Sequence, residues 1–307
     1  MQVQQVTPLT GGWSTDTSRV HATCETAGAV REMDLVVRRV PSDGLLAPYD
    51  VGREHRILRA LKDAPVPVPA VFGCDPAGEY LDGPCLVTEY VPGEPLSFFG
   101  QSTDSGDPRL QAYYATLASI HSLDWHAYGL EFLDEADDPI DAELHRVEVR
   151  MDLHGPAGPR DLAMLDWLRA HKPPDTTKVL MHGDPNPANY IFAAERIAAV
   201  LDWELAFVGD PRTDLGFFAA IQSIFGGAWQ LDAASFVRGY AAANPSANLR
   251  HLAYFEAMGL FRVAAFLHAA KRRPEMDAAP LWQRLHQRFE QIASGPDEGG
   301  LAEAEAR

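Results

Sequence analysis

Cysteine is scarce in this chain of 307 residues, and the three that occur, Cys24, Cys74 and Cys85, are widely spaced. Such usage excludes a disulfide framework and a zinc knuckle, and it favours a reducing compartment. No apolar run reaches the ~18 residues of a membrane span. The N-terminal sequence also lacks the basic and apolar segments of a signal peptide. We therefore expect a cytoplasmic protein with no membrane partner.

Basic residues are few as well, because 26 Lys and Arg face 43 Asp and Glu and give a formal net charge of -17. Non-specific nucleic-acid binding needs bases that neutralise phosphates, so nucleic acid is disfavoured as a partner. Residues 31–62 nevertheless hold more bases than acids, which leaves room for a small polyanion such as a nucleotide. Residues 131–143 are rich in carboxylates, and they are either a solvated face or a surface for a cationic acceptor.

The order of apolar patterns predicts two unlike halves. Strand patterns at 20–24, 34–40 and 85–91 surround one helical pattern at 50–61, and the Ala27-Gly28 pair indicates a hairpin. Helical spacing then dominates, interrupted by a strand-loop-strand block at 178–203. We predict an α+β protein with a β-rich lobe over residues 1–91 and a mainly helical lobe over residues 92–293. Residues 294–307 are expected to form a disordered tail.

The strand-loop-strand block carries the most informative polar residues. The apolar segment Val179–Met181 leads into a loop with Asp184, and a second apolar segment leads into Asp202. A hairpin between the two segments can bring both carboxylates and Asn189 to one point. Such an oxygen-rich set suits Mg²⁺ rather than zinc.

This set of groups fits phosphoryl transfer. One carboxylate orients a hydroxyl and takes its proton, while an amide and a second carboxylate hold the metal against a nucleotide. A single Asp would be interpreted as a turn residue. Three polar residues at these spacings, flanked by apolar strands, favour a site.

Three motifs of the chain resemble the aminoglycoside phosphotransferase family: His182-Gly-Asp-x4-Asn, Leu201-Asp-Trp-Glu and Gly209-Asp-Pro-x2-Asp-Leu. Within that family the chain is most similar to the branch that includes the kinase-like domain of acyl-CoA dehydrogenase fusion proteins. The resemblance covers nearly the whole chain. It implies a protein-kinase-like two-lobed fold, with ATP and Mg²⁺ as cofactors.

The resemblance also implies roles for individual residues. Asp184 matches the catalytic aspartate, and Asn189 and Asp202 match the two metal ligands. His182 is expected to orient the loop through its ring nitrogens. Asp210 and Asp214 are expected to support the site as loop and helix-cap residues and not to bind ligand themselves.

The N-terminal half contributes weaker candidates for nucleotide binding. In this context, a loop with glycines and small hydroxyls resembles the family's phosphate-covering loop, although an ordinary hairpin loop fits the pattern as well. The segment 88–91 matches the family's hinge, where backbone groups would contact adenine. The candidates in these two segments are Gly11, Gly12, Ser14, Thr15, Thr88, Glu89, Tyr90 and Val91.

Arg38 stands where many relatives carry a lysine that binds phosphate. Strand alternation puts Val36 and Arg38 on one face and Arg39 on the other, so Arg38 is the candidate. Glu54 matches the glutamate that pairs with this base. An arginine fork binds phosphate with a geometry different from that of an ammonium group. The alternative is that Arg38 and Glu54 are ordinary surface residues.

Three functions stay open on the sequence alone. The first is an ATP- and Mg²⁺-dependent O-phosphotransferase that acts on a hydroxyl of a small acceptor. The second is a non-catalytic nucleotide-binding module, suggested by Arg38 in place of lysine. The third is a metal-dependent hydrolase built on His182, Asp184, Asp202 and Asp210.

Overall fold

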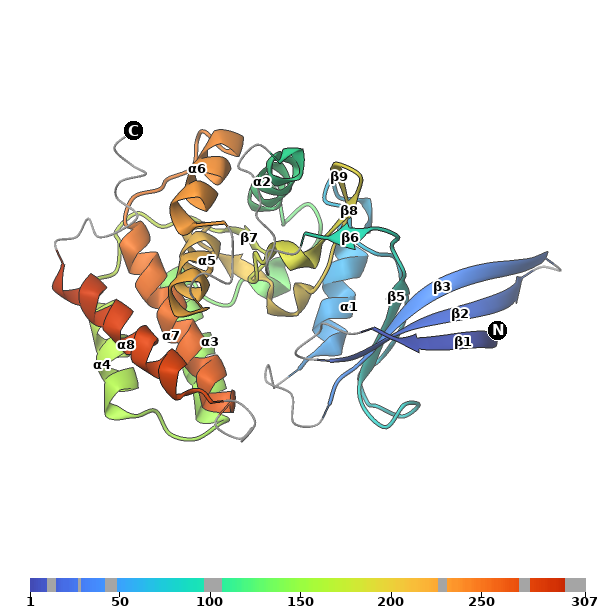
Figure 1. Ribbon diagram of the computed structural model, residues 1–307, viewed down its shortest axis with the longest axis horizontal. Coiled ribbons are helices and arrows are strands. Elements are labelled where there is room, and N and C mark those ends of the chain that lie inside the picture. The colour runs from blue at the N-terminus through green and yellow to red at the C-terminus, as the bar shows by residue number, and fades with distance from the viewer. Residues whose placement is uncertain are drawn as a thin grey trace.

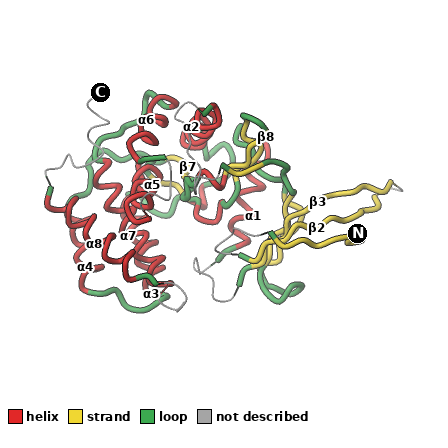
Figure 2. The backbone as a smooth tube through the Cα atoms, in the orientation of Figure 1, coloured by secondary structure: helices red, strands yellow, loops and turns green. Residues whose placement is uncertain are grey.

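Strands gather in the N-terminal part of the molecule and helices in the C-terminal part (Figure 2). The structure is a computed structural model and describes residues 1–9, 15–26, 29–41, 49–96, 107–225, 231–270 and 277–295. Five antiparallel strands form one sheet in the order β1-β2-β3-β5-β4. Their bounds are Gln2–Pro8 for β1, Asp16–Thr26 for β2, Ala29–Arg39 for β3, Val71–Asp75 for β4 and Cys85–Glu89 for β5.

The predicted hairpin is the pairing of β2 with β3, and its turn at 27–28 lies outside the described residues. The sequence pattern did not indicate β1, because all seven of its residues are exposed and no apolar alternation marks them. Helix α1 (Val51–Ala60) lies beside β4 and β5 (Figure 1). Asp50 begins this helix, since its carboxylate accepts a hydrogen bond from the amide of Arg53 at 2.8 Å.

Beyond β5 the chain enters the helical lobe through β6 (Glu94–Pro95), which pairs with β8. The predicted strand-loop-strand block is formed by β7 (Val179–Met181), β8 (Tyr190–Ala193) and β9 (Arg196–Val200). The hairpin of β8 and β9 lies between the two segments that carry the acidic residues. A further strand, β10 (Phe207–Gly209), pairs with β7.

Seven helices form most of the C-terminal lobe that the structure describes, and they pack around two apolar clusters. Two of them, α3 and α6, were not predicted; α3 begins within the acidic stretch at 131–143. The helices are α2 (Pro108–His121), α3 (Pro139–Asp152), α4 (Pro159–Ala170), α5 (Arg212–Phe225), α6 (Ala233–Ala243), α7 (Leu252–Ala270) and α8 (Ala279–Ser294).

Helix α7 is the core helix of this lobe. By length and composition it could cross a membrane, but 89% of its apolar window is buried inside the protein. It crosses α5 at Gly216 and Gly259, where a Cβ on Gly216 would lie 2.2 Å from the backbone of Phe255. The crossing therefore requires glycine. Of the tail expected at 294–307, Ser294 ends α8, and residues 296–307 lie outside the described residues.

Candidate active site

Asp184 lies on the loop that follows β7, one residue after Gly183. Gly183 has φ +83°, and a Cβ there would lie 2.1 Å from the carbonyl oxygen of Leu205. Glycine alone allows both the positive φ and this close approach. The loop is thereby held against the segment that follows Asp202.

Asn189 contacts Asp184 directly. The Nδ2 group of Asn189 donates to Oδ2 of Asp184 at 3.0 Å and to its carbonyl oxygen at 3.1 Å. The amide of Leu201 donates to the carbonyl oxygen of Asn189 at 2.8 Å, so the end of β9 lies against the same loop. Asp202 follows at once, and the structure brings the three predicted residues together.

The electrostatics of Asp184 are those of a carboxylate that holds its proton more tightly than usual. Burial raises its pKa above the ordinary value, and the negative charge of Asp202 raises it further. His182 and the hydrogen bond from Asn189 act in the opposite direction. A raised pKa brings a carboxylate closer to the range of an effective general base.

Asp202 adopts the left-handed conformation, with φ 59° and ψ 54°. Aspartate tolerates this region better than most residues. Trp203 holds the turn, because its side chain is fully buried and Nε1 donates to the carbonyl oxygen of Val200 at 3.0 Å. The Asp202 carboxylate is left 42% exposed on the side facing the N-terminal lobe, where it meets Arg38.

Arg38 bridges the two lobes. Its guanidinium donates to Oε2 of Glu54 and to Oδ1 of Asp202, both at 2.5 Å. Burial alone would lower the pKa of Arg38, but the carboxylates of Glu54, Asp202 and Glu204 together raise it above its usual range. Burial raises the pKa of Glu54, which is only 2% exposed. The two residues are therefore buried ion-pair partners and not ordinary surface residues, while Arg39 pairs with exposed Asp16.

His182 uses both ring nitrogens inside the protein. Nε2 donates to the carbonyl oxygen of Leu201 at 2.8 Å, and Nδ1 accepts from the amide of Asp184 at 3.3 Å. The imidazole is thus occupied in holding the loop and has no nitrogen left for a metal. Asp210 also points elsewhere, so the residue set of the hydrolase hypothesis does not converge.

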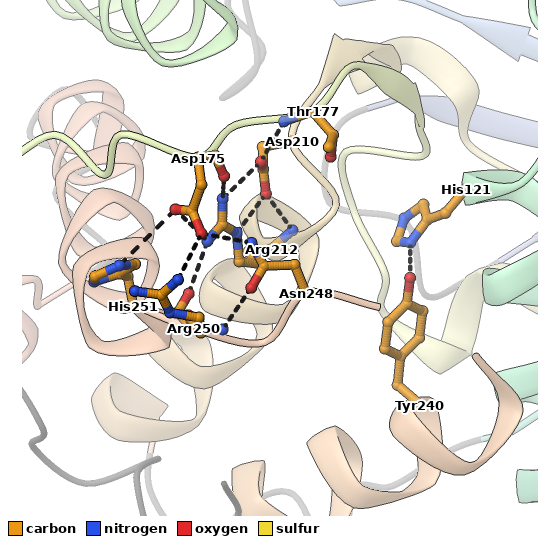
Figure 3. A network of polar contacts seen from close by, with 9 residues as sticks. All are labelled: His121, Asp175, Thr177, Asp210, Arg212, Tyr240, Asn248, Arg250 and His251. Carbon is orange, nitrogen blue, oxygen red and sulfur yellow. Dashed lines mark hydrogen bonds and ion pairs between the residues drawn. The ribbon is translucent and has the colours of Figure 1, made fainter. Parts of the chain in front are cut away.

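Asp214 supports the catalytic loop from within α5. It was expected to cap a helix, but it lies in the first turn of α5 and is fully buried. One carboxylate oxygen accepts from the amide of Gly183 at 3.1 Å, and the other accepts from Nε2 of His121 at 3.1 Å. His121 Nδ1 in turn accepts from the hydroxyl of Tyr240 at 2.7 Å (Figure 3). A chain of hydrogen bonds therefore connects α6 to the loop that carries Asp184.

Asp210 forms a buried ion pair with Arg212 (Figure 3). Its carboxylate accepts from Nε of Arg212 at 2.8 Å and from the backbone amides of Thr177 and Arg212 at 2.9 and 3.0 Å. Asp210, and not Asp214, therefore caps the start of α5. The pair ties the segment before β7 to α5.

The predicted phosphate-covering loop lies largely outside the described residues, and Gly11, Gly12 and Ser14 with it. Thr15 is described, and its hydroxyl lies 3.2 Å from that of Thr17. A narrow cleft lies between Thr15 and the Arg38–Glu54 pair. Other residues that line this cleft are Val40, Tyr49, Asp50, Val51, Leu86 and Glu204.

The predicted hinge covers the end of β5, an inner strand of the sheet, and the residues that follow it. The amide of Glu89 donates to the carbonyl oxygen of Ala70 at 2.8 Å, and the amide of Tyr90 donates to that of Asp34 at 3.0 Å. Thr88 is buried within the sheet. Among the described residues the amide of Val91 has no hydrogen-bond partner, which leaves it as the free donor of the segment.

Two residues that the sequence interpretation missed connect α1 to the segment after Asp202. Arg53 donates to the carbonyl oxygens of Glu204 and Ala206, at 3.4 and 2.5 Å. Glu204 lines the cleft and acts electrostatically on Arg38. Glu204 is the last residue of the Asp-Trp-Glu motif. Its position two residues after Asp202 was therefore the sequence signal that could have identified it.

The acidic stretch at 131–143 is engaged within the protein. Five of its seven carboxylates form ion pairs with bases of the chain, and Asp138 also caps α3. Lys172, for example, lies 2.6 Å from Asp138 and 2.8 Å from Asp141. Most of these side chains are therefore paired within the protein.

The side chains present fit a magnesium ion that is completed by a nucleotide. Asp202 and Asn189 supply a carboxylate and an amide oxygen, and Mg²⁺ is commonly held by one or two carboxylates with waters and substrate phosphates. No cluster of three or more His, Cys, Asp or Glu side chains suited to a metal occurs in the described part of the chain. Within that part of the chain, such side chains therefore do not form a complete metal site by themselves.

Comparison with models of known protein families assigns the chain to one family. The model of the "Phosphotransferase enzyme family" matches residues 5–255. Acyl-CoA dehydrogenase family member 10 of Mus musculus is 32% identical over 195 residues, which are 61% of this chain and 18% of that protein. Family member 11 of Rattus norvegicus is 30% identical over 193 residues, which are 59% of this chain and 24% of that protein. The chain therefore matches less than a third of the length of these curated relatives.

Solved structures share the two-lobed fold. A thermostable mutant of aminoglycoside phosphotransferase APH(4)-Ia, in complex with ADP and hygromycin B, has a TM-score of 0.64 at 17% identity and covers 97% of this chain and 95% of its own. Choline kinase LicA from Streptococcus pneumoniae has a TM-score of 0.63 at 16% identity, with coverages of 96% and 95%. The predicted protein-kinase-like fold is confirmed.

Proposed function

Because the chain belongs to the phosphotransferase enzyme family, we propose that it is an ATP- and Mg²⁺-dependent O-phosphotransferase that acts on a hydroxyl of a small acceptor. The observation that supports this most directly is the convergence of Asp184, Asn189 and Asp202 beside the cleft that Arg38 and Glu54 line. A general base, metal ligands and a base that binds phosphate are the parts that phosphoryl transfer needs.

In this proposal Asp184 accepts the proton of the acceptor hydroxyl. The hydroxyl oxygen forms a bond to the γ-phosphorus of ATP, and the bond between that phosphorus and the β–γ bridging oxygen breaks. The products are the phosphorylated acceptor and ADP, with one proton released. Asn189 orients Asp184 through its Nδ2 group, so that one carboxylate oxygen stays directed toward the acceptor.

The nucleotide would be held from three sides. Asp202 and Asn189 would hold Mg²⁺, which, when bound, neutralises charge on the phosphates. Arg38, kept in place by Glu54, would contact a phosphate. The free amide of Val91 would donate to the adenine edge.

A screen for ADP release tests the proposal. Purified protein with ATP and Mg²⁺ is offered aminoglycosides, macrolides, sugars, choline-like amines and hydroxyacyl thioesters. Acceptor-dependent ADP release supports the phosphotransferase. If calorimetry detects ATP binding but no acceptor gives ADP release, the result would instead support a non-catalytic nucleotide-binding module. This module is the second candidate because Arg38 forms an ion pair with Asp202, one of the proposed metal ligands.

The pH dependence of transfer follows from Asp184. Its pKa is raised by burial, so the ionised form that accepts a proton is lost at a higher pH than for a free aspartate. We expect kcat/KM to fall on the acid side of neutrality with an apparent pKa above the ordinary ~4 of aspartate. A pH–rate profile that stays flat down to that value would contradict Asp184 as the base.

A further inference from the structure

Four arginines are linked by shared carboxylates or by their mutual charge and are called the arginine cluster here: Arg53 of α1, Arg146 and Arg150 of α3, and Arg262 of α7. Helices α3 and α7 pack against each other in the helical lobe (Figure 1). One member of the cluster, Arg53, contacts the segment after Asp202, because it donates to carbonyl oxygens of that segment.

Two carboxylates form ion pairs with arginines of the cluster. Glu143 lies 2.8 Å from Arg146 and 3.7 Å from Arg262. Glu135 lies 2.8 Å from Arg146 and 3.8 Å from Arg53. Each carboxylate is therefore shared between two guanidinium groups, and no ion pair with a described residue is left for the fourth arginine.

That fourth arginine, Arg150, faces the N-terminal lobe. It lies within electrostatic reach of Tyr49, which precedes α1, and of Glu204, which lines the nucleotide cleft. Burial and the like charge of Arg262 together lower the pKa of Arg150 to about 10, while Glu143 acts in the opposite direction. Arg150 is still positively charged at neutral pH.

Arg262 lies within electrostatic reach of Asp184. Its charge acts on Asp184, and its side chain is 94% buried, with 6% exposed. Its Nη1 group is buried and has no hydrogen-bond partner, although Glu143 is within ion-pair distance. A buried guanidinium donor without an acceptor is costly, and an anionic ligand would relieve that cost.

Aromatic rings hold the two guanidinium groups in fixed positions. The Cζ atom of Arg262 lies 4.4 Å from the ring centroid of Phe217, and that of Arg150 lies 5.2 Å from the ring centroid of Phe266. Stacked arginines keep their planar donor groups ordered before a ligand arrives.

We propose that the acceptor carries an anionic group, a carboxylate or a phosphate, and that Arg150 and Arg262 bind this group while the acceptor hydroxyl meets Asp184. The inference rests on the proposed function and names its substrate class. Arg38 pairs with Glu54 and Asp202 and would serve the nucleotide, which leaves these two arginines for the acceptor. Guanidinium groups match carboxylate and phosphate oxygens in bidentate geometry.

The test compares hydroxyl compounds of opposite charge in the ADP-release assay. The first arm contains hydroxy acids and the second contains sugar phosphates, which are anionic. The third arm contains cationic compounds, namely amino alcohols and aminoglycosides. We expect turnover in the first or second arm, and the better arm distinguishes carboxylate from phosphate. Turnover confined to the third arm overturns the inference and leaves the proposed phosphotransferase intact.

Variants then assign the arginines. With the best anionic acceptor, Arg150→Gln should raise the acceptor KM by about tenfold or more and leave the ATP KM within about twofold. Arg262→Gln should act in the same direction if it folds. Arg169→Gln, an exposed arginine of α4 paired with Glu148, should change neither KM. A rise in the ATP KM instead of the acceptor KM would show that the arginines bind nucleotide and would overturn the inference.

A binding arm covers the case in which no acceptor is turned over and the proposed function itself fails. Tartrate and glycerol 3-phosphate are added to the protein with Mg²⁺ and a non-hydrolysable ATP analogue, and the melting temperature is measured. We expect one of the two anions to raise it in the wild type and not in Arg150→Gln. No rise with either anion, or an equal rise in both proteins, overturns the inference.

Discussion

Asp184→Asn should lower kcat for phosphoryl transfer by about 10²–10⁴ while ATP still binds with nearly wild-type affinity. The substitution removes the proton acceptor but keeps the shape of the side chain. Asn189 and the amide of Asn186 donate to opposite carboxylate oxygens of Asp184, and the single amide oxygen of asparagine can still accept one of these two hydrogen bonds. Initial rates of ADP release and calorimetric titration with ATP measure the two quantities.

Stability separates a catalytic effect from a folding defect in this variant. The folded-state pKa of Asp184 is raised above its unfolded value, so its ionised form costs stability at neutral pH. Asp184→Asn removes that cost but also loses one accepted hydrogen bond, so its melting temperature should stay close to that of the wild type. Asp166→Asn, an exposed aspartate of α4, is the matched control and should keep full activity. Wild-type rates in Asp184→Asn would remove Asp184 from the mechanism.

Arg212→Leu should lower the free energy of unfolding by about 3–5 kcal/mol. Arg212 is 1% exposed and donates to Asp210, to the carbonyl oxygen of Arg250 at 2.8 Å and to that of Asp175 at 2.5 Å. Leucine fills much of the volume but leaves the Asp210 carboxylate buried without its counter-charge. Urea unfolding followed by fluorescence measures the loss.

The neighbouring Arg250 provides the control for this substitution. Its side chain is 71% exposed and lies 3.6 Å from Asp175, so Arg250→Leu should change stability by no more than about 0.5 kcal/mol. Arg212→Lys keeps the charge and should fall between the two. Equal stability of Arg212→Leu and Arg250→Leu would show that the buried ion pair is not a stabilising element.

The sequence predicted those features that depend on local pattern. Alternation in β3 selected Arg38 over Arg39, and the structure places Arg38 toward Glu54 and Asp202. The spacing of Asp184, Asn189 and Asp202 predicted their convergence, because a hairpin between two apolar strands leaves little freedom in where the ends lie. The residue roles at this site stay predictions until they are measured.

Features that depend on tertiary partners could not be read from local pattern. Asp214 was expected to be a helix cap because it precedes an apolar helix, but its partners Gly183 and His121 come from distant segments. The acidic stretch suggested a cationic acceptor because its bases, such as Lys172 and Arg146, lie outside it in the sequence. The arginine cluster could not be predicted for the same reason, because its residues come from three helices, α1, α3 and α7.

Magnesium dependence of ATP binding tests the central claim most directly, namely that Asp184, Asn189 and Asp202 form a metal–nucleotide site. Calorimetric titration with ATP is performed with Mg²⁺ and with EDTA, on the wild type and on Asp202→Ala. We predict that Mg²⁺ tightens ATP binding to the wild type and has no such effect on Asp202→Ala. ATP affinity that is the same with Mg²⁺ and with EDTA in the wild type, or an unchanged Mg²⁺ effect in Asp202→Ala, would contradict the account.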